Sequence, residues 1–135
     1  MDGDGELRGV NYDQIREALE VFIRKGKING AQKAAKLLRK NLTSEQLEQI
    51  LEVQIKEGEF FDDIKKIVKL LHRNLTTEEL LRMVEIQIKR KWYYKAMYIA
   101  DFLPEPLRVE KLQFILNRQI EREQLDDAER TIALL

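Results

Sequence analysis

The stretch NLTSEQLEQILEVQIKEGEFFDD at residues 41–63 returns as NLTTEELLRMVEIQIKRKWYYKA at residues 74–96. In both copies the matching residues recur at i, i+3, i+4, i+7 and i+8, and nearly all of them are apolar. This spacing is typical of an amphipathic helix that packs one face against a core. One short phrase therefore encodes one helix, and its return predicts a repeat protein.

The same register continues in both directions along the chain. An offset of 33 residues relates the two central copies, and an offset of 32 leads to the outer ones. The four sets predict four core-facing first helices: Ile15, Ala18, Leu19, Phe22 and Ile23; Leu47, Ile50, Leu51, Gln54 and Ile55; Leu80, Met83, Val84, Gln87 and Ile88; Leu112, Ile115, Leu116, Gln119 and Ile120.

A second apolar set follows each first helix after a short turn. Small or branched residues recur there at helical spacing: Ala31, Ala34, Ala35 and Leu38; Ile64, Ile67, Val68 and Leu71; Ala96, Ile99, Ala100 and Leu103; Ala128, Thr131, Ile132 and Leu135. Eight helices in four hairpins predict an all-α fold, an α-solenoid in which each hairpin buries its apolar face on its neighbour. We expect an acidic, disordered tail at 1–9 and one repeat domain at 10–135, with repeats at about 10–41, 42–74, 75–106 and 107–135.

Helix boundaries can also be predicted. Thr43 with Gln46, and Thr76 with Glu79, have the spacing of a capping box, and Asn11 caps the first helix. In the last copy Arg108 falls at the cap position. At the ends of the first helices, a left-handed residue is expected at Gly26, Gly58, Lys91 and Glu123, while Asn41 and Asn74 close the first two hairpins.

Composition excludes several classes of protein. Lys plus Arg and Asp plus Glu are equal at 24 each, so no overall charge favours nucleic acid or an anionic membrane. The absence of cysteine excludes disulfides and thiolate chemistry and is typical of a cytoplasmic protein. We expect no signal peptide, and no apolar run in this sequence is long enough for a membrane span. No catalytic constellation is present, so we expect neither an enzyme nor a cofactor or metal site.

These residues resemble the tetratricopeptide repeat, whose signature is W-x2-L-G-x2-Y, then A-x3-F, then proline. The later alanine slot is filled by Ala31, Ile64, Ala96 and Ala128, and "GKINGA" and "EQLDDA" are similar to the family's inter-helix turn. The resemblance covers residues 10–135. It diverges where Leu or Val fills the glycine slot and Gln fills the tyrosine slot in three copies. It implies a right-handed superhelix whose first helices line a concave groove for a peptide or partner protein.

Two sets of residues are candidates for lining that groove. Glu20, Glu52, Glu85 and Asn117 recur at one position of the repeat and form an acidic row that would favour a basic ligand. Gln54, Gln87 and Gln119 fall inside the apolar stripes, where a buried amide without partners costs about 1–3 kcal/mol. Each amide should therefore either pair between neighbouring repeats or reach the ligand.

A basic and aromatic stretch, KRKWYYKAMY at 89–98, has two readings. Trp92, Tyr94 and Arg90 have the residue types of a protein-interface hot spot. The same stretch, with Lys89, could serve an RNA-binding helical repeat, which is the alternative function. A further alternative is a structural unit that self-associates through the apolar end near Leu134.

Overall fold

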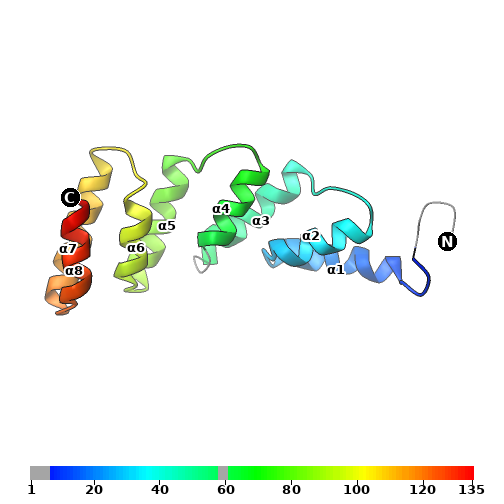
Figure 1. The fold of residues 1–135 in the computed structure, drawn as a ribbon, viewed down its shortest axis with the longest axis horizontal. Helices are drawn as coiled ribbons and strands as arrows, with labels where there is room; N and C mark the ends of the chain where they lie inside the picture. Colours follow the sequence, from blue (N-terminus) through cyan, green and yellow to red (C-terminus); the bar gives the residue numbers. More distant parts are fainter. Residues whose placement is uncertain (1–6, 58–60) are drawn as a thin grey trace. The chain divides into compact units, whose positions relative to one another are not determined.

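The computed structural model describes residues 7–57 and 61–135, which form eight helices and no strand (Figure 1). The predicted all-α class is confirmed. Each helix is short, with 8 to 15 residues. The helices are α1 (Tyr12–Arg24), α2 (Ile28–Leu37), α3 (Ser44–Glu57), α4 (Phe61–Leu70), α5 (Thr77–Lys89), α6 (Tyr93–Ala100), α7 (Leu107–Glu121) and α8 (Leu125–Leu134).

The contacts divide the chain into two compact units, with the boundary inside α3 after Gln54. The first unit holds α1, α2, most of α3, and α4. Within it, α1 packs on α2, and the Lys66 ammonium of α4 donates to the Asn29 side chain of α2 at 2.6 Å. The second helices of this unit are therefore neighbours.

The second unit holds the end of α3 from Ile55 and the helices α5 to α8. Here α5 packs on α6, α6 on α7, and α7 on α8. Lys111 of α7 forms an ion pair with Glu85 of α5, and Thr131 of α8 contacts Met97 of α6. In this unit too, first helix lies beside first helix and second beside second.

The predicted stripes form the core in three of the four copies. Most of their apolar residues in α3, α5 and α7 are buried, and Ile88 and Leu116 are half-buried. Ile120 is an exception and a correction, because its side chain is 51% exposed. In α1 the stripe is only partly covered: Leu19 and Ile23 are buried, while Phe22 is half-buried. The periodicity alone does not show that the stripe of α1 is less covered than the other three.

Both predicted capping boxes are present. The Thr43 and Thr76 hydroxyls accept from the amides of Gln46 and Glu79 at 3.1 Å, and the Gln46 and Glu79 side chains accept in return from the threonine amides at 2.9 Å. These reciprocal bonds satisfy amides that a helix start leaves without partners.

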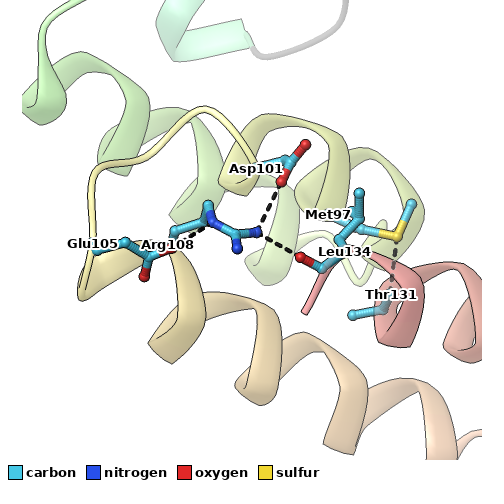
Figure 2. Close-up of polar contacts among 6 residues, drawn as sticks. All are labelled: Met97, Asp101, Glu105, Arg108, Thr131 and Leu134. Carbon is cyan, nitrogen blue, oxygen red and sulfur yellow. Dashed lines mark hydrogen bonds and ion pairs between the residues drawn. The ribbon is translucent and has the colours of Figure 1, made fainter.

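The predicted cap at Arg108 is wrong. Pro106 precedes α7 as its cap residue, so Arg108 lies in the first turn. Its guanidinium donates to Glu105 at 2.7 Å, to Asp101 at 3.0 Å and to the Leu134 carbonyl oxygen at 2.8 Å (Figure 2). The side chain therefore ties the start of α7 to the ends of α6 and α8, a role that depends on tertiary packing.

Left-handed residues end the first helices at the predicted positions. The φ angles are +72° at Gly26, +62° at Lys91 and +56° at Glu123, while Gly58 lies outside the described residues. The prediction that Asn41 and Asn74 close the first two hairpins needs correction. Arg39 and His72, each with φ of +57°, are the left-handed residues after α2 and α4. In each of these five turns the next amide donates back to the helix, as in Trp92 N to Gln87 O at 2.9 Å.

Replacing Lys91 by glycine should stabilise the chain by about 0.5–1 kcal/mol, because glycine adopts a positive φ without strain. The gain is smaller than the strain itself, since glycine also loses more entropy on folding. Urea unfolding measures the change. Lys91→Ala is the control, because it shortens the side chain and keeps the strain; equal stabilities of the two variants would contradict this account.

Candidate functional site

An open groove lies between the first helices α1 and α3 of the first unit. Its volume is about 570 Å³, and two members of the predicted acidic row, Glu20 and Glu52, line it together. The apolar side chains Ile23 and Val53 line it as well. The remaining lining residues are Arg24, Gln46 and Gln49. Carboxylates in a groove with an apolar lining suit a ligand with a cationic and an apolar group.

The other two members of the row lie in the second unit and differ from the first two. Glu85 on α5 forms an ion pair with Lys111, which reaches across from α7. Asn117 on α7 is exposed and uncharged. Lys111 therefore already neutralises Glu85 within this unit.

The three glutamines are buried, with exposures of 1% or less. The Gln54 amide nitrogen donates to the Gly26 carbonyl oxygen at 2.6 Å, which joins α3 to the turn of the preceding hairpin. The Gln119 amide oxygen accepts from the Thr131 hydroxyl at 2.7 Å within the last hairpin. The bond of Gln54 is a pairing between neighbouring repeats, as predicted, whereas Gln119 pairs within its own repeat. We assign no ligand contact to Gln54, Gln87 or Gln119, because their side chains have almost no accessible surface.

The basic and aromatic stretch lies at the start of α6. Trp92 is 41% exposed, and two cations approach its ring: the Arg90 guanidinium at 5.2 Å and the Lys95 ammonium at 4.5 Å from the centroid. Arg90 also donates to the Glu57 carbonyl oxygen. A cation over an aromatic ring is attracted to the face of that ring, which restricts both side chains. Trp92 and Arg90 therefore already have partners inside the second unit.

Tyr94 and Tyr98 extend this aromatic surface along α6. Their rings meet edge to face with centroids 4.9 Å apart, and their hydroxyl oxygens are 2.9 Å apart. The hydrogen bond with Tyr98, with partial desolvation second, raises the pKa of Tyr94 from its ordinary value of 10.0. A raised pKa means that the folded state binds this proton more tightly than the unfolded state does. The contribution to stability is complete below pH 10 and is lost as the pH rises through the folded pKa.

Replacing Tyr98 by phenylalanine should therefore lower the pKa of Tyr94 towards 10.0, because the ring contact stays and the hydrogen bond is lost. Titration of the Tyr94 ¹³Cζ resonance by NMR measures this. Tyr12→Phe is the control, since Tyr12 lies on α1. An unchanged Tyr94 titration in the Tyr98→Phe variant would show that the hydroxyl pair does not set the pKa.

A strongly basic segment of the first unit was missed when only the apolar repeat was followed. Residues 21–44 contain seven cationic side chains and no carboxylate: Arg24, Lys25, Lys27, Lys33, Lys36, Arg39 and Lys40. The equal overall totals of acidic and basic residues conceal it. A charge count over a short window would have found this segment.

Comparison with protein-family models, with curated proteins and with solved structures gives no match. Function must therefore be argued from the residues and their geometry. None of the helices in the described ranges has both the length and the apolar character required to cross a membrane.

Proposed function

We propose that the chain is a right-handed α-solenoid, divergent from but similar to a tetratricopeptide-repeat array, and that it binds a peptide segment of a partner protein on its first helices. The in-register neighbours within each unit support the solenoid: Lys66 beside Asn29 in the first, and Lys111 beside Glu85 in the second. Stacking of equivalent helices is how hairpin repeats bury their apolar faces.

One observation carries the functional proposal: Glu20 and Glu52 share an open groove with Ile23 and Val53. We infer a ligand with Lys or Arg residues flanking an aliphatic side chain. Charge would speed the encounter, and burial of the apolar side chain would supply affinity. Glu85 is not part of this site in the proposal, because it lies on α5 and does not line the groove.

The test is fluorescence anisotropy with a labelled peptide in which Lys-Arg pairs alternate with leucines. The Glu20→Lys, Glu52→Lys double variant should weaken binding by about tenfold or more, which corresponds to about 1.4 kcal/mol. The matched control, Glu110→Lys with Glu129→Lys, makes the same change in charge at exposed positions of α7 and α8. Equal weakening by both variants would overturn the groove as the binding site.

A second candidate function, self-association, is favoured by a different observation. Ile120, Leu125 and Ile132 are 51%, 65% and 57% exposed, whereas their equivalents in earlier copies are mostly buried, such as Ile55, Tyr93 and Ala100. In those copies the positions pack against other helices of the array. The surface formed by Ile120, Leu125 and Ile132 therefore has the character of a hairpin-docking face.

Sedimentation across a wide range of protein concentration tests this second candidate. A self-associating chain should gain mass as concentration rises, and Leu125→Glu with Ile132→Lys should keep it monomeric. Both substitutions are at exposed positions, so the helical circular dichroism should be unchanged. A concentration-independent monomer mass for the native chain would exclude self-association through this face.

A further inference from the structure

The second helices of the first unit carry one basic pattern twice. At the offset of 33 residues, α2 and its end match α4 and its end at five positions: Lys33 with Lys66, Lys36 with Lys69, Leu37 with Leu70, Arg39 with His72, and Lys40 with Arg73. All but Arg73 are exposed. Lys66 of α4 donates to Asn29 of α2, and residues of both segments line one pocket, so the two patterns lie on neighbouring helices.

This pocket has a volume of about 510 Å³. Lys36, Lys40 and His72 supply its basic groups, with the amides of Gln32 and Asn41 beside them. Its apolar lining comes from Ala35, Leu42, Leu47 and Leu70. None of the described residues that line this pocket is a carboxylate, so no acidic side chain among them neutralises the two lysines.

We propose that this pocket docks an acidic peptide segment of a partner protein, one that places an aliphatic side chain between carboxylates. The carboxylates would meet Lys36 and Lys40 at the solvent-facing side, where lysine ammonium groups keep much of their hydration. The aliphatic side chain would cover Leu70 and Leu42, which gains free energy in proportion to the apolar area removed from water. The site is distinct from the groove of Glu20 and Glu52 and takes a ligand of the opposite charge.

The lining of the pocket favours an acidic peptide over two other anionic partners, single-stranded nucleic acid and a bilayer surface. Single-stranded nucleic acid is held by aromatic side chains on which bases stack, and the pocket has none. A phosphate backbone also has no group that would use the leucines. A bilayer surface contacts apolar side chains that protrude, whereas Leu42 and Leu47 lie inside the pocket, half-buried and buried.

The test uses a fluorescein-labelled peptide in which Glu-Asp pairs alternate with leucines, titrated at physiological salt. Lys36→Glu with Lys40→Glu should weaken its binding by about tenfold or more. The matched control, Lys33→Glu with Lys65→Glu, makes the same change in charge on α2 and α4 outside this pocket. It should lose only about two- to threefold, because the Debye length at this salt is about 8 Å.

A variant with no change in charge distinguishes contact with the pocket lining from the general electrostatic attraction of the basic surface. Leu70→Ser removes apolar lining at a partly exposed site, so the fold should be retained. Because apolar area is lost from the pocket, peptide binding should weaken by about fivefold or more. A second peptide with serine in place of leucine should bind the native chain correspondingly weakly. Circular dichroism of each variant shows whether α2 and α4 are intact.

Three results would overturn the proposal. The first is equal loss of binding in the Lys36, Lys40 variant and in its control. The second is equal affinity for the leucine and serine peptides. The third is tighter binding to an oligothymidylate, or to vesicles containing phosphatidylserine, than to the leucine peptide. Because the peptide of the proposed groove is basic, failure of one site leaves the other independently testable.

Discussion

Replacing Gly26 by alanine is expected to destabilise the chain by about 2–4 kcal/mol, in two parts. A residue with a Cβ at φ of +72° costs about 1 kcal/mol of backbone strain. In addition, the new Cβ would stand 2.8 Å from Cγ1 and 3.0 Å from Cβ of Val53 on α3. Such overpacking costs about 1–3 kcal/mol. Urea unfolding followed by circular dichroism measures the total.

A control separates strain from steric overlap. Gly9 also has a positive φ, +77°, and a Cβ there would have no atom within 4 Å. Gly9→Ala should therefore cost no more than about 1 kcal/mol. In a double-mutant cycle, Val53→Ala should recover part of the Gly26→Ala loss. If the two losses simply add within about 0.5 kcal/mol, Val53 is not the cause.

The overlap matters because Gly26 is where α3 contacts the preceding turn. The Gln54 amide donates to the Gly26 carbonyl oxygen in a buried position. Moving the turn away from Val53 would lengthen this bond and leave a buried carbonyl without its donor, at a cost of about 1–3 kcal/mol. Gly26→Ala should thus loosen the contact between the first two hairpins.

Truncating Ile67 to alanine is expected to cost about 2–4 kcal/mol. The side chain lies on α4 and is 0% exposed, so its removal leaves a cavity that the neighbouring helices fill only in part. The measurement is the same urea unfolding. The effect is large relative to the total stability of 5–15 kcal/mol that is typical of such domains.

Ile132→Ala is the matched control, since it removes the same atoms from a side chain that is 57% exposed. Its cost should stay near or below about 0.5 kcal/mol. Similar losses at both positions would mean that Ile67 does not lie in a packed core. If the Ile132→Ala cost grows with protein concentration, the side chain is buried between copies, as the self-association candidate requires.

The sequence sufficed for the helices, their order and most of their core residues. These features are local: a helical period places Ile50 and Leu51 on one face, and a capping box closes within four residues of Thr43 or Thr76. The left-handed residue at Lys91 was also predictable, although it is not glycine, because Lys91 occupies the same position of the repeat as Gly26. The periodicity of the sequence thus predicts the local features that all repeats share.

The pairing of side chains from different helices was decided only by packing in three dimensions. Glu85 meets Lys111, Arg108 meets Leu134, and Lys36 shares a pocket with His72, although each pair is 26 to 36 positions apart in the sequence. Whether a carboxylate is available to a ligand depends on which cation the neighbouring helix brings beside it. Apolar residues must recur to bury each hairpin, but surface charges are under no such constraint. The repeat therefore predicts the helices and two residues of the proposed groove, Glu20 and Glu52, but not which charges pair across helices.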